Sequence, residues 1–426
     1  MMQLEKFDSV SIKYLNNLKE ENIKLVSSKS ESNRALIINA LASGSGMLGN
    51  LSEARDTQTM MKLLATTSKT WDVLDAGTTM RFLTGYAAAN GLNKVLTGTE
   101  RMQQRPIKIL VDALREIGVV IKYLKEDGYP PIEIVDFPSQ LTNHIKVRGD
   151  VSSQYISALA MIAPTLPNGL TIELTGRIGS KPYIEMTLEL MRKFGAHVSF
   201  NEHIIQINPV NYSEASYIIE SDWSGASYWF SFAALADHAK IKLLGLRENS
   251  LQGDIAIVKI MDHLGVEASF DHEGVSLSKK AMGSIDKIDF THCPDLAQTV
   301  CVTLAATGKS CELVGLESLR IKETDRIAAL QNELSKFGGY LDEINSSSWK
   351  LIPSDQNIKE IKGLKFHSYE DHRMAMAFAP LAAITNIEID EPFVVKKSYP
   401  GYWEDLKKVG FELKFNSYSL KEENGK

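Results

Sequence analysis

The chain has 426 residues, of which 44% are hydrophobic and 23% are charged, and its formal net charge is −6 at pH 7. This length is too great for one ordinary hydrophobic core, so we expect two domains or a repeat architecture. The composition excludes a disordered or fibrous protein, no apolar run is long enough to span a bilayer, and the acidic balance argues against a general nucleic-acid binder.

The cysteines and the N-terminus bear on the cellular compartment, and the cysteines and histidines bear on metal binding. Cys293, Cys301 and Cys311 are odd in number and lack CxxC spacing, which favours reduced thiols over disulfides or zinc ligands. The nine histidines show no ligand spacing such as HExxH, so we expect no metal site. The first residues carry acids and no apolar stretch, unlike a signal or transit peptide. Together these features predict a cytoplasmic protein.

Amphipathic helices that end at glycine and lead into two short strands recur along the chain. The glycines, spaced by roughly 70 residues, are Gly118, Gly195, Gly265, Gly338 and Gly410. Residues 60–71 match the pattern poorly, and counting them gives about six copies. Because no copy can bury its own apolar faces, several must pack together, and we expect three in each of two lobes.

A second helix precedes each of these units, and its start is rich in hydroxyls, glycine and often a cation. In chain order the starts contain Ser27–Ser30, Asp75–Thr79, Ser152–Gln154, Ser224–Ser227, Cys293–Asp295 and Tyr369–Asp371. One such start is an ordinary N-cap. Several with cations attached predict helix N-termini that converge on a shared anion.

A further helix start stands out because it is crowded with charge. Apolar residues recur at helical spacing over residues 327–337, and Lys322 and Arg326 flank the start of this helix. The N-terminal end of the helix dipole is already positive, so the two cations are repelled there, and a bound anion would compensate for that repulsion. Glu323 beside them offers a carboxylate for proton transfer. A solvated, charged helix start is the alternative interpretation.

Two other stretches combine hydroxyls or cations at helical spacing. Lys29 adjoins Ser30 and Arg34, which share a helix face, and the alternative is a capped helix with a surface arginine. Arg101 and Arg105 are four residues apart, so they either fork onto a phosphate or are solvated.

The roles of two hydroxyl residues and one acid near helix starts remain open when each stretch is considered alone. Ser180 and Tyr183 flank a proline near a helix start, which is typical of either a cap or an anion socket. Asp295 considered alone is interpreted as an N-cap.

Taken together, eight stretches resemble the 5-enolpyruvylshikimate-3-phosphate synthase family, in that family's order and over nearly the whole chain. They are residues 29–34, 76–81, 101–106, 152–154, 180–183, 322–326, 371–376 and 397–400. The resemblance implies an α/β (α+β) fold, a two-lobed, inside-out barrel-like enolpyruvyl transferase fold with six strand-helix copies, three per lobe. We expect one lobe over residues 28–221, with shikimate 3-phosphate sites, and a discontinuous lobe over residues 1–27 and 222–426, with phosphoenolpyruvate arginines.

The resemblance also implies a reaction. The enolpyruvyl group of phosphoenolpyruvate would be transferred to the 5-hydroxyl of shikimate 3-phosphate, with release of phosphate, by addition and elimination through a tetrahedral intermediate in chorismate biosynthesis. The resemblance implies that the reaction needs no metal and no organic cofactor. It also implies that glyphosate inhibits the protein. We expect a monomer with no nucleic-acid or membrane partner.

Site residues are carried over by motif match. Those implied to hold shikimate 3-phosphate are Ser30, Arg34, Ser152, Ser153, Gln154, Ser180, Tyr183, Asp295, Ser318 and Lys322. Those implied to hold phosphoenolpyruvate are Lys29, Gly77, Arg101, Gln154, Arg326, Arg373 and Lys397. Asp295 would accept the proton of the 5-hydroxyl, and Glu323 would move a proton to or from the methylene carbon, with Lys29 as a further acid.

Three positions depart from the family pattern. Asp75 and Ser318 stand where asparagines are often found, and Ser28 replaces a glycine. An extra carboxylate near phosphoenolpyruvate would weaken anion binding unless it were paired, for instance with Arg81 or Arg101.

Two other functions remain as alternatives. The sister family transfers the same group to UDP-N-acetylglucosamine and typically has a cysteine in the loop near Arg101, but the first cysteine here is Cys293. A non-catalytic anion-binding protein is the second alternative. Retention of Asp295, Glu323 and Lys397 together argues against it, because two acids weaken simple anion binding.

Overall fold

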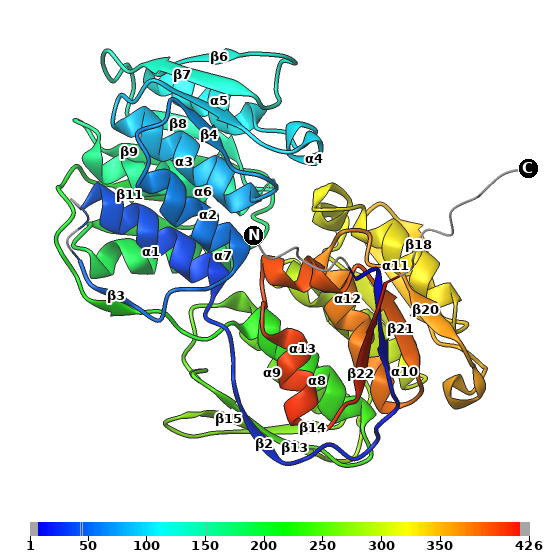
Figure 1. The fold of residues 1–426 in the computed structure, drawn as a ribbon. Helices are drawn as coiled ribbons and strands as arrows, with labels where there is room; N and C mark the ends of the chain where they lie inside the picture. Colours follow the sequence, from blue (N-terminus) through cyan, green and yellow to red (C-terminus); the bar gives the residue numbers. More distant parts are fainter. Residues whose placement is uncertain (1–6, 43, 45, 151, 418–426) are drawn as a thin grey trace, which may run out of the picture.

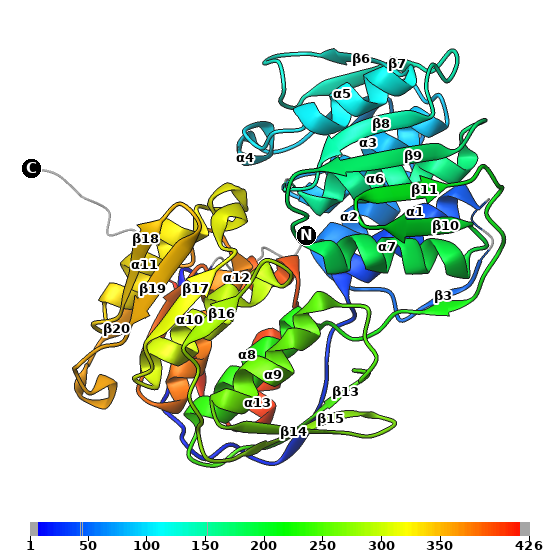
Figure 2. The same cartoon turned by 180° about the vertical axis from the view of Figure 1, so that it is seen from behind.

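The structure is a computed structural model that describes residues 7–42, 44, 46–150 and 152–417. It consists of two lobes that are joined by two crossing segments of the chain (Figures 1 and 2). Ser27 and Ser221, one on each crossing segment, form an isolated antiparallel β-bridge.

Each lobe has its own hydrophobic core. One cluster of buried apolar side chains comes from residues 35–219 and defines the first lobe. The other comes from residues 10–25 and 223–411 and defines the second lobe. The two clusters share no residue, so each lobe gains its hydrophobic stabilisation separately.

We propose that these cores mark two domains, with the boundaries expected from the sequence. Residues 28–221 would form one domain, and residues 1–27 with 222–426 would form the other. The two separate cores support this division, which stays a prediction. Its outer ends, 1–6 and 418–426, lie outside the described residues.

Within the described residues, five sheets have four strands each and share one topology, in which two parallel strands are extended by two antiparallel ones. In the first lobe they consist of β4 (Thr70–Asp72), β5 (Lys94–Thr97), β7 (Ile132–Asp136) and β6 (Val120–Tyr123), and of β8 (His144–Arg148), β9 (Leu170–Thr175), β11 (Ile204–Ile207) and β10 (Val198–Asn201). A smaller sheet there pairs β3 (Leu48–Gly49) with β12 (Tyr217–Ile218) in parallel.

The second lobe holds the other three four-stranded sheets. They consist of β2 (Glu21–Lys24), β13 (Lys240–Leu244), β15 (Gly274–Lys279) and β14 (Val266–Phe270); of β16 (Lys287–Asp289), β17 (Cys311–Val314), β19 (Ser348–Ile352) and β18 (Tyr340–Asn345); and of β20 (Leu364–Phe366), β21 (Ile387–Asp390), β1 (Ser9–Ile12) and β22 (Leu413–Asn416). Strands β1 and β2 come from the N-terminal segment, which therefore belongs to this lobe.

Helices fill the interior of each lobe and the sheets lie outside them (Figures 1 and 2). The first lobe holds α1 (Lys29–Leu41), α2 (Arg55–Leu64), α3 (Gly77–Ala89), α4 (Glu100–Gln103), α5 (Lys108–Ile117), α6 (Ser153–Ile162), η1 (Ala163–Thr165) and α7 (Lys181–Lys193). The second holds α8 (Trp223–Leu235), η2 (Gly253–Ala256), α9 (Ile257–His263), η3 (Pro294–Leu296), α10 (Ala297–Ala306), η4 (Glu317–Ile321), α11 (Arg326–Ser335), η5 (Ile358–Glu360), α12 (His372–Phe378), η6 (Ala379–Ala383), η7 (Pro392–Lys397) and α13 (Tyr402–Lys408). No helix within the described residues combines the length and the apolar character needed to cross a membrane.

The predicted repeat is confirmed for the five glycine-ended units. Each glycine follows a helix, four of them precede two strands of one four-stranded sheet, and Gly410 precedes β22, which pairs with β1 instead. All five have positive φ, from 81° at Gly338 to 120° at Gly118. Glycine adopts this left-handed conformation without the strain that a Cβ would cause, so it ends the helix and turns the chain toward the strand.

Two details of the predicted repeat are wrong. Residues 60–71 do not form one copy, because Met60 lies in α2 and Trp71 lies in β4, the first strand of the next sheet. Residues 224–227 do not precede their helix but lie inside α8, because Asp222 Oδ2 accepts the backbone N–H of Gly225 at 2.9 Å and caps the helix earlier.

We expect Gly118→Ala to destabilise the first lobe by roughly 2–4 kcal/mol. A Cβ there would lie 2.3 Å from the backbone oxygen of Ser139, in addition to the positive φ. The matched control is Gly91→Ala, since Gly91 also has positive φ but nothing within 4 Å of a Cβ; it should cost about 1 kcal/mol. Urea unfolding of both variants measures the difference, and equal costs would contradict the steric argument.

Candidate active site

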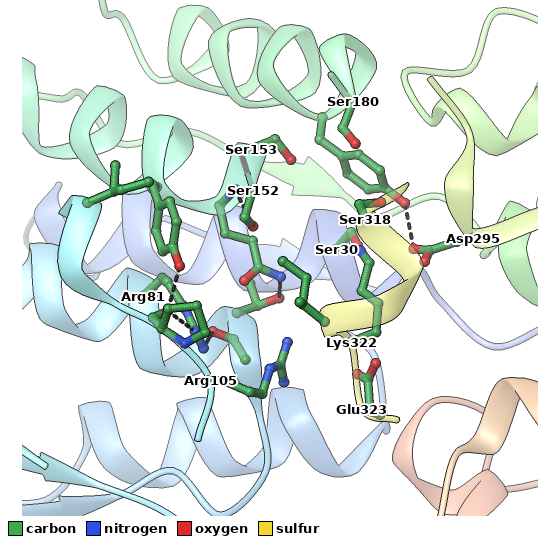
Figure 3. Close-up of a pocket in the computed structure, with 18 of the residues that line it drawn as sticks. Ser30, Arg81, Arg105, Ser152, Ser153, Ser180, Asp295, Ser318, Lys322 and Glu323 are labelled. Atoms are coloured by element: carbon green, nitrogen blue, oxygen red, sulfur yellow. Dashed lines mark hydrogen bonds between the residues drawn. The ribbon is translucent and has the colours of Figure 1, made fainter. Parts of the chain in front are cut away.

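A cavity of about 410 Å³ lies between the lobes, and all the site residues predicted from the sequence line it except Arg101 and Lys397. Figure 3 shows Ser30, Ser152, Ser153 and Ser180 of the first lobe around the same space as Asp295, Ser318, Lys322 and Glu323 of the second. The first residues of α1, α3, α6 and α12 line it as well. The predicted convergence of helix starts on one place is therefore confirmed.

A second cavity of about 800 Å³ adjoins the first, since Arg105 and Glu323 line both. It contains the two predicted residues that the first cavity lacks, Arg101 and Lys397, together with Asp75. Both adjoining cavities are thus lined by cations and carboxylates from both lobes.

Asp295 contacts both lobes. Its Oδ2 accepts a hydrogen bond from the Tyr183 hydroxyl of the first lobe at 3.0 Å and forms an ion pair with Arg373 Nη2 at 3.0 Å, and its Oδ1 accepts from Arg326 Nη1 at 3.2 Å. Burial opposes its charge, but Arg373, Lys322 and Arg326 outweigh burial and hold the pKa of Asp295 well below its usual range. The N-cap interpretation of Asp295 is wrong, because no side-chain cap bond forms at η3.

Arg326 is 1% exposed and donates to three carboxylates. Its nitrogens lie 2.7 Å from Asp371, 2.9 Å from Glu323 and 3.2 Å from Asp295. Burial would raise the pKa of Glu323, but the charges of Arg326, Lys397 and Arg105 outweigh it and keep that pKa well below its usual range. Both predicted proton-transfer acids are therefore ionised in this structure.

The lysines of the site are held differently. Lys29 Nζ donates to Asp56 Oδ2 at 3.1 Å. Lys322 lines the cavity from the end of η4, and burial, with the Arg326 and Arg105 charges, lowers its pKa despite Asp295 and Glu323. The imidazole of His372 also lines the cavity, and burial, with the neighbouring Lys29 and Arg373 charges, lowers its pKa well below the usual value.

The first-lobe wall is made of hydroxyls and amides. Gln154 Nε2 donates to Thr78 Oγ1 at 3.2 Å, and Ser152 caps α6. Arg34 is buried and donates to Thr187 Oγ1 at 2.7 Å, to the Ser30 carbonyl at 2.8 Å and to Ser157 Oγ at 3.3 Å. Most of the hydrogen-bond donors of Arg34 are therefore used within the first lobe, and a ligand would interact mainly with its charge.

Arg101 and Arg105 lie in different environments, because α4 ends at Gln103, between them. Arg101 is exposed and donates to the backbone carbonyls of Lys322 and Glu323, both at 3.0 Å, across the lobe interface. Arg105 instead lines the first cavity, with no hydrogen bond or ion pair from its guanidinium to any described residue. Arg105 was considered with Arg101 as a phosphate ligand from its spacing, but it is not among the site residues carried over by motif match.

Gly77 makes room for Arg105. A Cβ at this position would lie 2.6 Å from Arg105 Nη2 and 2.8 Å from Nη1. The absence of a side chain therefore lets the guanidinium lie against the start of α3, inside the cavity.

The predicted partners of Asp75 are wrong as well. Its carboxylate pairs with Arg55 Nη2 at 2.8 Å and 2.9 Å and with Lys397 Nζ at 2.8 Å, rather than with Arg81 or Arg101. Arg81 donates to the carbonyl of Pro106 at 2.7 Å and is buried within the first lobe.

One group of side chains lies close enough together in space to bind a metal ion. His367, Asp390 and Glu391 place one ligand atom each within 4.8 Å of one another. Ser368 donates to Asp390 through its N–H and to Glu391 through its hydroxyl, and the His367 ring contacts Asp390. Because these hydrogen bonds account for the cluster, we assign no metal to it.

Fold and site together define a two-lobed α/β enzyme that gathers buried cations and ionised carboxylates around cavities between its lobes. The family model described as EPSP synthase (3-phosphoshikimate 1-carboxyvinyltransferase) matches residues 15–72 and 64–406. The chain therefore belongs to the EPSP synthase family, as the resemblance implied.

Similar proteins agree with this result. The chain is 48% identical to the 3-phosphoshikimate 1-carboxyvinyltransferase of Bacteroides fragilis over 92% of this chain and 96% of that protein. It is 33% identical to the one from Cronobacter sakazakii over 91% and 95%. A solved EPSP synthase from Acinetobacter baumannii, 18% identical, matches with a TM-score of 0.76 over 96% of this chain and 100% of that one, which confirms the predicted α/β fold.

Behind Arg373 lies Asp254, a carboxylate that the sequence analysis did not select. Ser224 joins the two: its hydroxyl accepts from Arg373 Nη2 at 3.3 Å and donates to Asp254 Oδ2. Burial, with the Asp295 charge, raises the pKa of Asp254 to about 7. Its other oxygen, Oδ1, has no hydrogen-bond partner among the described residues.

We expect Asp254→Asn to stabilise the protein at pH 8 by roughly 1–3 kcal/mol. The folded state binds the Asp254 proton more tightly than the unfolded state does, so the parent loses stability as pH rises from about 4 to about 7. Asparagine has the same shape and does not titrate. Thermal unfolding should show a higher melting temperature for the variant than for the parent at pH 8 and nearly equal melting temperatures near pH 4. A difference in melting temperature that does not depend on pH would contradict this prediction.

Proposed function

We propose that this protein transfers the enolpyruvyl group of phosphoenolpyruvate to the 5-hydroxyl of shikimate 3-phosphate and releases phosphate. The observation that carries the proposal is the ionised Asp295, hydrogen-bonded to a first-lobe tyrosine and second-lobe arginines in a cavity lined by cations. The family membership and the similarity to 3-phosphoshikimate 1-carboxyvinyltransferases support it. We also propose that the protein acts as a monomer in the cytoplasm, with no nucleic-acid partner.

Each substrate has a proposed position. The hydroxyls and amide of Ser30, Ser152, Ser153, Gln154, Ser180 and Tyr183, with Arg34, Ser318 and Lys322, would hold shikimate 3-phosphate. Lys29, Gly77, Gln154, Arg326, Arg373 and Lys397 would hold phosphoenolpyruvate. We add Arg105 to this second group, because its guanidinium is buried, lines the cavity and has no partner among the described residues.

Substrate binding would also prepare the proton-transfer groups. In this structure the arginines hold Asp295 and Glu323 ionised, and carboxylates so strongly stabilised are weak bases. Phosphate and carboxylate groups that bind the same arginines would offset that stabilisation and raise both pKa values. Asp295 would then accept the 5-hydroxyl proton, and Glu323 or Lys29 would deliver a proton to the methylene carbon.

Addition and elimination both fit this arrangement. A proton added to the methylene carbon would make the neighbouring carbon open to attack by the 5-hydroxyl oxygen, giving a tetrahedral intermediate. Loss of phosphate and of one proton from the resulting methyl group would then form the enol ether. The surrounding cations would stabilise the charge of the departing phosphate throughout.

The first test measures phosphate release from phosphoenolpyruvate with shikimate 3-phosphate or UDP-N-acetylglucosamine as acceptor. We expect release with shikimate 3-phosphate alone, and a kcat lowered at least about 100-fold by Asp295→Asn, because the general base is removed. Asp286→Asn, which changes an exposed carboxylate, serves as the control. Release with the nucleotide sugar alone, or with neither acceptor, would overturn the proposal.

A second test separates the two arginines of residues 101–106. We expect Arg105→Gln to raise the KM for phosphoenolpyruvate at least about 30-fold, because a buried charge that meets the anion is lost. Arg101→Gln should raise it less than about 10-fold and affect both substrates alike, because Arg101 only holds the segment of Lys322 and Glu323. A larger and selective effect of Arg101→Gln would show that Arg101 is the residue that binds phosphoenolpyruvate.

A further inference from the structure

The contact between Asp75 and Lys397 joins the two lobes. Asp75 follows β4 in the first lobe, and Lys397 ends η7 in the second. Lys397 Nζ lies 2.8 Å from Asp75 Oδ2 and 3.4 Å from the Asp75 carbonyl oxygen. The lysine side chain is only 3% exposed, so this ion pair is largely shielded from water on its cationic side.

Lys397 is surrounded by acid in this structure. Besides Asp75, Glu323 Oε1 lies 3.5 Å from its ammonium. Burial lowers the pKa of Lys397, but the charges of Glu323, Asp56 and Asp75 outweigh burial and raise it. An ammonium so neutralised attracts a further anion less strongly than a free one does.

Asp75 differs from the other two acids in what it does for the protein. Asp56 is paired with Lys29 at 3.1 Å, and Glu323 is paired with Arg326 at 2.9 Å. Asp75 is half-buried and has Arg55, which is half-exposed, as its other partner. Of the three it lies closest to Lys397, and it is the one whose other cation, Arg55, is half-exposed, so both that cation and water can stabilise its charge when it leaves Lys397.

We propose that Asp75 is a positioning residue that occupies Lys397 in place of a substrate anion, holding the lobes in contact while weakening the affinity of the site for phosphoenolpyruvate. This inference rests on the proposed function for the identity of the anion. When the phosphate arrives, Lys397 exchanges the Asp75 carboxylate for a phosphate oxygen, and Asp75 stays paired with Arg55. The lobe contact made by the ion pair is then replaced by one that the anion makes.

The variant that tests this is Asp75→Asn, which keeps the size and an acceptor oxygen and removes the charge. We expect the KM for phosphoenolpyruvate to fall about three- to ten-fold, with kcat and the KM for shikimate 3-phosphate changed by less than about two-fold. Glu100→Gln is the matched control, because Glu100 is an exposed acid of the same lobe that lines the same cavity without contacting Lys397. It should leave all three constants at the parent values.

A double-mutant cycle assigns the effect to Lys397. In a Lys397→Gln background, Asp75→Asn should no longer lower the KM, because the cation that Asp75 occupies is absent. If the decrease persists, the effect comes from Arg55 or from the general field of the cavity, and the proposal is wrong. Thermal unfolding of each variant verifies that it is folded.

Titration of inorganic phosphate by calorimetry tests the same exchange without turnover. Asp75→Asn should bind phosphate about three- to ten-fold more tightly than the parent. Equal or weaker binding, or an unchanged or raised KM, overturns this inference. A parent that releases no phosphate from phosphoenolpyruvate instead overturns the proposed function, so the two failures are distinguishable.

Discussion

The balance between buried cations and buried carboxylates governs this site. Arg326 and Arg373 are almost removed from water, and a buried charge is tolerated only when a partner compensates for its lost hydration. Asp295, Glu323 and Asp371 supply that compensation here. The carboxylates proposed to move protons are thus the ones that keep the arginines stable, so their basicity depends on whether another anion shares the arginines.

The fold creates this balance by bringing helix starts together. Helices α3, α8 and α10 are buried on nearly all sides within their lobes, so the N-terminus is the part of each helix that is left to face the space between the lobes. The sheets cover the outside, and glycine with positive φ ends the helix that leads into each hairpin. Residues far apart in the sequence, such as Lys29 and Arg373, therefore line one cavity.

Periodicity and helix-start chemistry were enough to predict the repeat, the two lobes and the convergence of helix starts, because these depend on local patterns, whereas the assignment of individual residues to the substrate sites came from the family resemblance. Arg105 was not selected because its position depends on where α4 ends and on the missing side chain of Gly77. The prediction of the partners of Asp75 was wrong because one of its actual partners, Lys397, lies 322 residues away in the sequence, across the lobe interface. Asp254 gave no sequence signal, since its hydrogen-bond link to Arg373 runs through Ser224 and depends on the tertiary fold.

Contact between the lobes and recognition of anions use the same side chains. Tyr183 reaches Asp295, Lys397 reaches Asp75, and Arg101 reaches the backbone of Lys322 and Glu323. Apart from Arg101, each of these contacts uses a group that a substrate would also engage, so a bound anion must break or share a contact that joins the lobes. Anion binding and contact between the lobes then cannot vary independently, and a change of a single charge at the interface is expected to alter both the affinity for the anion and the stability of the lobe contact.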